Sequence, residues 1–318
     1  KEILLKSVAQ AIPSYAMSVF KFPKGICKSI TDESAGFWWG DKEEKKKMHW
    51  FAWWKMCVPK KKGGMGFRDL HSFNLAMLAK QCWRLIHNPD SLCAQVLGAK
   101  YYPDGNILRA RLKKGSSFTW QSIFAGIQTF KRGCIWRVGT GSQINIWEDP
   151  WIPSSPTRKV ITPRGGVMLS KVQDIIDPHT GQWDEALIQS VFSPVDVSRI
   201  LQIPLHVEVL EDFVAWQFTK SGTFSVHSAY HVEFDHQFDR HYRETNSPGT
   251  AQLNAVWKEI WQLHLPGKIK HFGWKVLKGV LPCYGVLADR HIPLIPQCPI
   301  CKVGLEDIQH CLFTCDRA

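Results

Sequence analysis

Four residues near the end of the chain have the types and spacing of metal ligands. In CPICKVGLEDIQHCLFTC, Cys298 and Cys301 form a CxxC pair, His310 follows after eight further residues, and Cys315 after four more. Structural zinc is held by four nitrogen or sulfur atoms in a tetrahedron, and three cysteines with one histidine are a common set. Because a closed set leaves no open coordination position, the pattern predicts structural Zn2+ rather than metal catalysis.

The neighbouring Cys311 leaves a second ligand set open. Cys311 and Cys315 are an i, i+4 pair on one helix face, whereas His310 and Cys315 lie about 140° apart on an ideal α-helix. Joint use of His310 and Cys315 therefore needs the helix to end before Cys315. The spacing alone also allows four cysteine ligands with His310 as a bystander. A further alternative is that these cysteines are simply buried or oxidised.

The composition is that of a globular protein with a polyanionic partner. The chain has 318 residues, 44% of them hydrophobic, and a formal net charge of +12. A basic balance favours nucleic acid, because each phosphate that is neutralised releases counterions. We expect no membrane segment, since no run of 18 apolar residues occurs. We expect a piece of a longer intracellular protein, because the chain starts at Lys1, has no signal peptide, and has no disulfide framework.

Apolar periodicity predicts a mainly helical beginning. Helical spacing occurs over residues 4–12, where Pro13 interrupts it, and over residues 26–38, which stop at Gly40. A third amphipathic helix is predicted over residues 69–87, before Pro89. Tryptophan is abundant, with 15 residues, and for most of them we expect a place in the core.

The middle of the chain has a different sequence pattern, with strand-like alternation and turn residues. Residues 136–147 alternate around a Thr-Gly-Ser turn, and residues 213–226 alternate around a Lys-Ser-Gly turn, so that two local β-hairpins are predicted. Residues 150–166, rich in Pro, Ser and Gly, are predicted to be a linker. The predicted fold class is therefore mainly α with a few short β-hairpins, an α+β chain.

Three groups of lysines are candidate contacts to a phosphate backbone. Two are runs in the first part of the chain: Lys45, Lys46 and Lys47, then Lys60, Lys61 and Lys62. The third lies on a predicted helix, with an apolar stripe formed by Ile269, Phe272, Val276 and Val280. The basic residues share the opposite face: Lys268, His271, Lys275 and Lys278. A merely solvated surface is the alternative for each group.

Several stretches, in order, resemble one known family. The chain is similar to the region that follows the polymerase core in LINE-type, non-LTR retroelement reverse transcriptases of plants. The stretches that carry the resemblance cover residues 4–26, 37–70, 73–92, 136–153, 221–230 and 260–292, with the cysteine cluster at the end. Among them are FWWGDKEEKKKMHWFAWWKMCVPKKKGGMGFRDL and WRVGTGSQINIWEDPWIP.

The resemblance implies an organisation and a ligand set. It implies a helical, thumb-like lobe over residues 1–132, a mixed segment over 133–205, and a small helical reverse transcriptase zinc-binding domain over 206–318. It also implies that the zinc ligands are Cys298, Cys301, His310 and Cys315. The implied partners are RNA or an RNA–DNA hybrid and the polymerase core of the parent protein, and the implied location is the nucleus.

Polymerase chemistry is not expected of this chain alone. Polymerases need paired carboxylates that hold two metal ions, and no Asp-Asp pair occurs in the sequence. The acidic pairs present, Glu43–Glu44 and Glu306–Asp307, lie in a lysine run and in the cysteine cluster. We therefore expect a non-catalytic, nucleic-acid-binding accessory part of an RNA-directed DNA polymerase. The alternatives are a zinc-stabilised protein-interaction module and a decayed retroelement remnant without activity.

Overall fold

The computed structural model describes residues 1–205, 211–243 and 250–316. The chain forms two compact units built from interleaved stretches. Unit 1 comprises Lys1–Ala11, Gly25–Asp69 and Asp239–Ala318, and unit 2 comprises Ile12–Lys24 and Leu70–Phe238. The division into 1–132, 133–205 and 206–318 stays a prediction.

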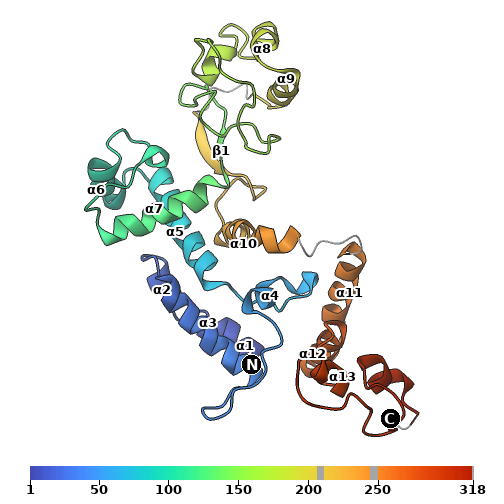
Figure 1. Ribbon diagram of the computed structural model, residues 1–318. Helices are drawn as coiled ribbons and strands as arrows, with labels where there is room; N and C mark the ends of the chain where they lie inside the picture. Colours follow the sequence, from blue (N-terminus) through green and yellow to red (C-terminus); the bar gives the residue numbers. More distant parts are fainter. Residues whose placement is uncertain (206–210, 244–249, 317–318) are drawn as a thin grey trace. The chain divides into compact units, whose positions relative to one another are not determined.

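Unit 1 is helical (Figure 1). Its first part contains α1 (Glu2–Leu4), η1 (Leu5–Ala9), α3 (Lys24–Trp39), α4 (Trp53–Cys57) and η2 (Lys60–Lys62). Its last part contains α11 (Thr250–Gln262), α12 (Gly267–Leu277), α13 (Tyr284–Ala288) and η5 (His310–Thr314). The helix predicted to stop at Gly40 is α3, which confirms that prediction.

A glycine loop joins the two parts of unit 1. Gly63 has φ +84°, and a Cβ atom there would lie 2.8 Å from the ring of Trp257 on α11. Its carbonyl oxygen accepts a hydrogen bond of 3.0 Å from the indole Nε1 of Trp274 on α12. Only glycine meets both demands, because other residues rarely adopt this backbone conformation and would clash with the indole. α11 and α12 therefore pack against the loop of residues 59–66.

Unit 2 contains most of the remaining elements. Its helices are α2 (Ser14–Met17), α5 (Leu70–His87), α6 (Leu92–Tyr101), η3 (Ile107–Arg109), α7 (Phe118–Lys131), η4 (Val172–Ile175), α8 (Glu185–Val191), α9 (Pro194–Leu201) and α10 (Val226–Arg243). Its strands are β1 (Cys134–Arg137) and β2 (Phe213–Trp216). The helix predicted over residues 69–87 is α5, as expected.

The centre of unit 2 is the contact between α5 and α7. A Cβ atom at Gly126 would lie 2.4 Å from the backbone of Leu78, so the absence of a side chain lets the two helices approach closely. Buried residues of both helices fill the contact, among them Leu78, Ile127 and Phe130. α10 is tied to α7 by Glu233, whose carboxylate accepts hydrogen bonds from Thr129 (2.7 Å) and Arg132 (2.5 Å).

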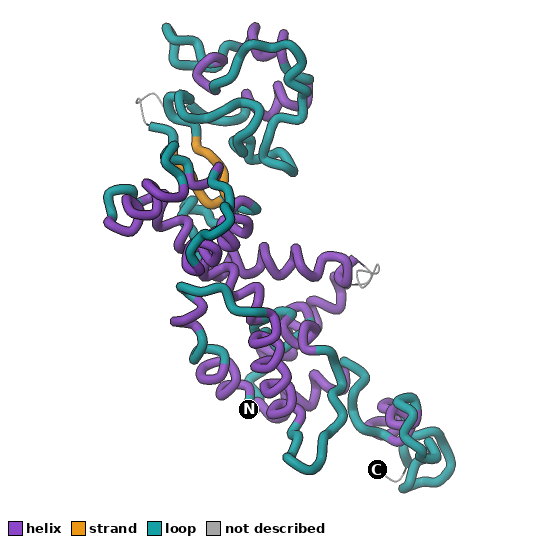
Figure 2. Tube along the Cα trace, turned by 60° about the vertical axis from the view of Figure 1, so that its left-hand side comes forward, coloured by secondary structure: helices purple, strands orange, loops and turns teal. Residues whose placement is uncertain are grey.

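The two strands pair with each other rather than in local hairpins, which corrects the prediction. β1 and β2 form an antiparallel pair with Cys134 opposite Trp216 and Arg137 opposite Phe213 (Figure 2). The Thr-Gly-Ser turn instead becomes a loop around Asp212, whose carboxylate accepts from the N–H groups of Gly139, Gly141 and Gln143, each at 2.8 Å. A buried carboxylate that satisfies three backbone donors outweighs the predicted three-residue hairpin turn.

The segment after β1 has its own core. Ten buried residues between 138 and 200 pack together, including Ile146, Trp151 and Ile188, and the residues of the predicted linker contribute Trp151 and Ile152 to it. Residues 150–166 are therefore not only a linker. Asp196, fully buried, accepts hydrogen bonds from the N–H groups of Ile161 (3.0 Å) and Thr162 (2.7 Å), which fixes this stretch to α9.

The mainly α fold class is confirmed, since helices dominate and the sheet has two strands. The expected place in the core is confirmed for five of the 15 tryptophans, and the other ten are half-buried. The buried five are Trp120, Trp151, Trp216, Trp257 and Trp274. Among the described residues, no helix has the length and apolar character that a membrane span requires.

The close approach at Gly126 makes a testable prediction. Gly126→Ala forces a methyl group into the backbone of α5 and should lower the free energy of unfolding by about 2 kcal/mol. The matched control is Gly98→Ala on α6, where the added Cβ atom lies at an ordinary 3.4 Å from the Tyr102 ring. Urea unfolding followed by tryptophan fluorescence checks both; equal stability of the two variants would contradict the packing described.

Candidate functional site

The structure brings the four predicted metal ligands together. The ligand atoms of Cys298, Cys301, His310 and Cys315 all lie within 4.8 Å of one another. The sulfurs of Cys298 and Cys315 are 3.9 Å apart, and His310 Nε2 lies 3.2 Å from the sulfur of Cys301. Two sulfurs at 2.3 Å from a tetrahedral zinc would be separated by roughly 3.8 Å, so the donor set fits this ion.

A tight loop positions the two cysteines of the CxxC pair. The backbone N–H of Cys298 donates to the carbonyl of Gly304 at 2.9 Å, and Gln297 pairs with Leu305 across the loop. Backbone N–H groups also point at the sulfurs. The N–H of Cys301 lowers the pKa of Cys298, and the N–H of Val303 contributes most to a pKa of about 6 for Cys301. Such donors favour the thiolate, which is the form that binds a metal.

A π-helical turn solves the spacing problem of His310 and Cys315. The N–H of Cys315 donates to the carbonyl of His310 at 3.0 Å, an i to i+5 bond, within η5. This wider turn brings residues five apart to the same side, which an ideal α-helix does not do. Cys315 itself has extended backbone angles, φ −78° and ψ 116°. The helix therefore ends before Cys315, as the sequence required.

The acidic pair beside the cluster, Glu306 and Asp307, accepts backbone hydrogen bonds that stabilise the fold around it. The carboxylate of Asp307 accepts from the N–H of His310 at 2.6 Å, the position of an N-cap three residues upstream. Glu306, which is 8% exposed, accepts from the N–H of Tyr284 at 2.6 Å at the start of α13. These carboxylates orient the ligand turn and attach it to α13.

Cys311 points to a different partner. Burial, followed by the neighbouring thiol of Cys311, raises the pKa of the Cys283 thiol to about 12. The group of side chains close enough to share one ion contains His310 and leaves Cys311 out. The geometry therefore favours the ligand set with His310 over the set of four cysteines.

The exposure of α12 differs from the sequence expectation. Ile269 and Phe272 of the predicted buried stripe are 44% and 46% exposed, whereas Trp274 is 1% exposed. Trp274 lies on the side of the helix that carries the basic residues, and burying an indole removes the larger apolar surface from water. The basic face therefore turns inward: Lys278 lies 4.9 Å above the ring of Trp257, and of the three lysines only Lys268 is exposed, whereas Lys275 and Lys278 are half-buried.

A hollow in unit 1 brings together the first predicted lysine run and one lysine of α12. It has a volume of about 790 Å³, and its lysines are Lys1, Lys45, Lys46, Lys47 and Lys275. Its aromatic wall consists of Trp38, Trp39, Trp50, His271 and Trp274. Glu2 is the carboxylate that lines it. Five lysines thus line the hollow with one carboxylate, while Asp41 attracts Lys46 from outside the lining.

Asp41 holds the lysine loop at the edge of this hollow. Its carboxylate accepts from the backbone N–H of Lys47 at 2.8 Å and contacts His49 Nε2 at 3.1 Å. The hydrogen bond from Lys47 is the main cause of a lowered pKa of Asp41. Lys42 and Lys45 close a tight turn through two backbone hydrogen bonds. Glu43 and Glu44 lie at the tip of that turn and not on the wall of the hollow.

Glu2 lies on the wall of the hollow and contacts three basic side chains. Its carboxylate contacts Lys60 at 2.7 Å, Lys6 at 2.8 Å and His271 at 3.2 Å. Burial by itself raises the pKa of Glu2, but hydrogen bonds from these three neighbours outweigh it and lower the pKa well below its ordinary value. Lys60 also lies 4.1 Å above the ring of Trp261, so it is part of the packing, while Lys61 and Lys62 are exposed.

Sequence reasoning missed the aromatic half of the hollow. Trp39 and Trp50 are half-buried on its wall, although the expectation for most tryptophans was a place in the core. The signal was present as tryptophans that flank the lysine run between residues 38 and 50. Glu2 was also missed, because its partners come from three separate parts of the sequence.

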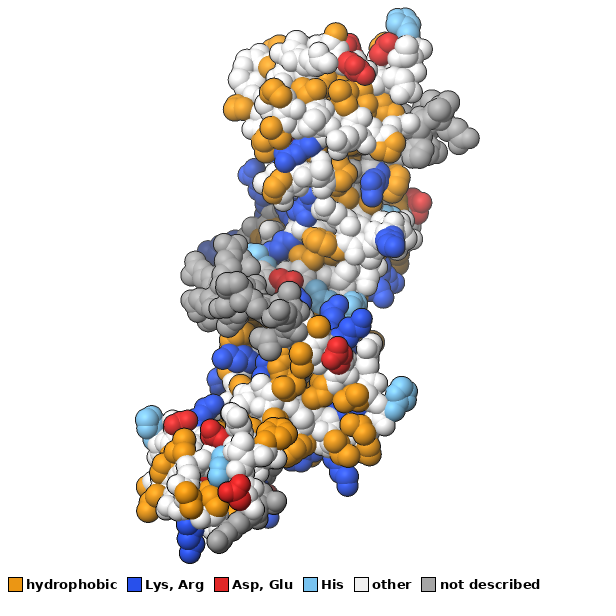
Figure 3. Space-filling model, turned by 90° about the vertical axis from the view of Figure 1, so that its right-hand side faces the viewer, with side chains coloured by type: hydrophobic (Ala, Val, Ile, Leu, Met, Phe, Trp, Pro, Cys, Tyr) orange, Lys and Arg blue, Asp and Glu red, His pale blue; other side chains and the backbone are white. Residues whose placement is uncertain are grey.

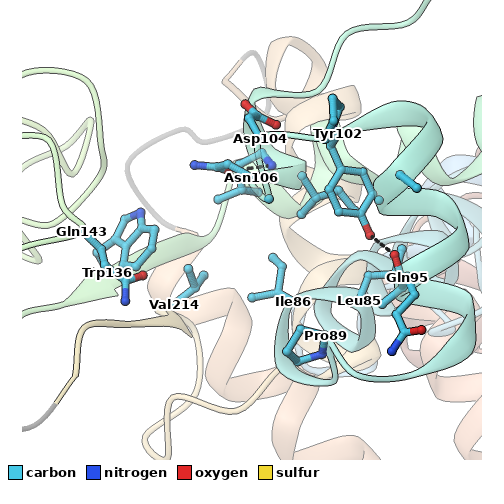
Figure 4. A pocket seen from close by; sticks show the side chains of 17 residues that line it. Leu85, Ile86, Pro89, Gln95, Tyr102, Asp104, Asn106, Trp136, Gln143 and Val214 are labelled. Carbon is cyan, nitrogen blue, oxygen red and sulfur yellow. Dashed lines mark hydrogen bonds between the residues drawn. The ribbon is translucent and has the colours of Figure 1, made fainter.

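A second pocket, of about 650 Å³, lies in unit 2 (Figure 4). Trp136 and Gln143 line one side, and Leu85, Ile86 and Pro89 line another. Tyr102 borders it and donates its hydroxyl hydrogen to the carbonyl of Ala94 at 3.3 Å. No lysine, arginine, cysteine or histidine lines this pocket, and none of the predicted site residues does.

Comparison with known proteins agrees with these features. Residues 224–318 match the family model described as zinc-binding in reverse transcriptase. A putative ribonuclease H protein of Arabidopsis thaliana is 32% identical over 98% of this chain, which spans 50% of that relative's length. An uncharacterized mitochondrial protein of the same plant is 41% identical over 45% of this chain and 93% of its own length. No solved structure matches the chain.

Removing the charge of Glu2 tests the network at the hollow. Glu2→Gln should lower the free energy of unfolding of the chain by about 1–2 kcal/mol at neutral pH. A carboxylate whose pKa is lower in the folded chain than in the unfolded chain stabilises the fold at pH values above its unfolded pKa. This stabilisation is lost as the pH falls toward the folded pKa. The difference in free energy of unfolding between Glu2→Gln and the parent should therefore shrink below about pH 4. Urea titrations at several pH values measure it, and a difference that does not depend on pH would count against the network.

Two single substitutions test the ligand set. We expect His310→Ala to lose the bound zinc, and Cys311→Ala to keep about one zinc per chain. Metal analysis of the purified 318-residue chains by mass spectrometry provides the measurement. Loss of zinc with Cys311→Ala and retention with His310→Ala would assign the fourth position to Cys311 instead.

Proposed function

This chain belongs to the plant retroelement reverse transcriptase family, in the region that carries the zinc-binding domain, and from this premise we propose that it is a non-catalytic, nucleic-acid-binding part of an RNA-directed DNA polymerase. The observation that carries the proposal is the basic hollow of unit 1. There, residues 45–47 and Lys275, which are far apart in the sequence, line one surface together with three half-buried tryptophans.

The charge balance of the hollow suits a phosphate backbone. Glu2 is engaged by Lys6, Lys60 and His271, so its charge is largely compensated within the protein. Five lysines line the hollow with this one carboxylate, and Asp41 interacts with Lys46 from outside the lining. Lysine ammonium groups near phosphates release condensed counterions, which supplies most of a sequence-independent affinity.

Zinc in this proposal is structural. Zn2+ held by Cys298, Cys301, His310 and Cys315 cross-links the knuckle loop to the C-terminal turn. The lobe needs such a link, because its larger apolar side chains are poorly buried: Ile300, Val303, Leu305 and Phe313 are between 52% and 88% exposed. An ion with four ligands closes the set, so the metal contributes folding free energy and no open position for catalysis.

The proposal includes the parts of the parent protein that the resemblance implies. Residues 1–132 act as a thumb-like lobe of a LINE-type polymerase, and residues 206–318 act as its zinc-binding domain. The partners are RNA or an RNA–DNA hybrid and the polymerase core, and the place of action is the nucleus.

A second candidate function, a protein-interaction module, is favoured by one surface. Apolar side chains on and just before α12 are between 43% and 47% exposed: Leu263, Leu265, Ile269, Phe272 and Leu277. Figure 3 shows hydrophobic side chains on the face that carries α11 and α12. Trp257 and Trp274 are buried, so they are not the anchors of this surface.

The nucleic-acid proposal predicts a large effect of residues 45–47. The triple variant Lys45→Ala, Lys46→Ala and Lys47→Ala should weaken RNA binding at least tenfold at moderate salt. It should also reduce the slope of log affinity against log salt by about 2, since each lost single-strand contact contributes roughly 0.7. Fluorescence anisotropy with a labelled RNA at four salt concentrations measures both quantities.

A matched pair on α12 locates the site. Lys275→Glu reverses a charge on the wall of the hollow, whereas Lys268→Glu reverses an exposed charge that does not line it. Binding should fall with the first and stay near the parent value with the second. Unchanged RNA binding in all of these variants would favour the interaction module.

A further inference from the structure

The rings on the wall of the hollow are not equivalent. Trp274 is 1% exposed, and its indole is committed to Gly63. Trp38 packs against Phe67 with ring centroids 5.1 Å apart and against His271 at 5.7 Å. Two half-buried rings remain, Trp39 and Trp50, and their neighbouring rings lie at longer distances.

Among the described residues, no aromatic ring stacks closely on either of these two rings. Trp39 meets Trp38 and His49 at centroid distances of 6.3 Å each. Trp50 has the guanidinium of Arg290 at 5.6 Å from its centroid. Neither ring has a closely stacked partner, in contrast to Trp53, whose ring lies parallel to Phe67 at 4.9 Å.

From this arrangement we propose that the hollow binds single-stranded nucleic acid, with unpaired bases stacked on Trp39 and Trp50 and the backbone held by residues 45–47. The inference rests on the proposed function and adds the class of strand to it. Aromatic platforms beside a basic groove are what proteins use to hold single strands without reading their sequence.

Duplex nucleic acid fits this surface poorly. In a duplex both faces of each base are covered by its neighbours, so stacking on a protein ring requires unstacking at a cost of a few kcal/mol per step. Unpaired bases offer their faces without that cost. A hollow of about 790 Å³ also has the size of a small-ligand pocket, so it accommodates bases of one strand and not the width of a helix.

The loop that carries the lysines is held in place for this role. Asp41 fixes the backbone at Lys47, and the turn closed by Lys42 and Lys45 keeps Glu43 and Glu44 at its tip. The chain therefore presents residues 45–47 to the same hollow as the two rings without their acidic neighbours. A strand seated there has its phosphates near the lysines and its bases near the indoles.

The test compares strands on the intact 318-residue chain. Labelled oligonucleotides of about 12 nucleotides, as single-stranded RNA, single-stranded DNA, an RNA duplex and an RNA–DNA hybrid, are titrated at one salt concentration. Both single strands should bind at least tenfold more tightly than either duplex and should quench tryptophan fluorescence. A preference for RNA over DNA among the single strands would identify contacts to the 2′-hydroxyl.

Substitutions of the two rings test whether the bases stack on them. Trp39→Ala and Trp50→Ala should each weaken single-strand binding by roughly 5- to 150-fold and leave duplex binding unchanged, while Trp39→Phe and Trp50→Phe should retain most of the affinity. Trp54→Ala is the matched control, since Trp54 is a half-buried tryptophan of the same unit that does not line the hollow.

The outcomes separate this inference from the proposed function. Equal affinity for single strands and duplexes, lost on removal of residues 45–47, would overturn the inference and leave the proposed function standing. Absence of binding to any of the four nucleic acids would overturn both. Because the strand comparison uses the unaltered chain, a variant that fails to fold does not prevent a decision.

Discussion

The buried hydrogen bond from Trp274 to the carbonyl of Gly63 connects residues that are 211 positions apart, and much of unit 1 depends on it. It can form because Gly63 has no side chain and adopts φ +84°, which leaves room for Trp257 beside it. Burial of the indole sets the rotation of α12 about its own axis. That rotation places Lys275 on the wall of the hollow and leaves Ile269 and Phe272 in contact with water.

The metal centre obeys a different constraint, because it is local. All four ligands lie within 18 residues, and the hydrogen bonds that shape the knuckle and the π-helical turn lie in the same stretch. Such a lobe buries little apolar surface of its own, so in the proposed function the free energy that holds it together comes from a bound zinc ion. Glu306 and Asp307 then attach the centre to α13 and orient His310.

Local signals predicted the elements well where packing agreed with them. α3 and α5 follow the apolar spacing of their sequences, and α3 ends at Trp39, before Gly40. The prediction of two local hairpins was wrong for a physical reason. Asp212, 71 residues from Gly141, satisfies the N–H groups of the turn, and β1 finds its partner in β2. Alternation indicates that a segment is extended, but it carries no information about a partner that is distant in the sequence.

The sequence by itself indicated a metal-ligand cluster near the end of the chain, with His310 and Cys311 as alternatives for one position, and the helical character of the chain, because both rest on spacing within a few turns. Only the tertiary structure decided that Cys311 lies outside the ligand group, that Lys60 and Lys278 belong to the packing, and that Trp39 and Trp50 line a basic hollow. These outcomes depend on contacts between segments far apart in the chain, and the free energy of burying large aromatic side chains selects among them.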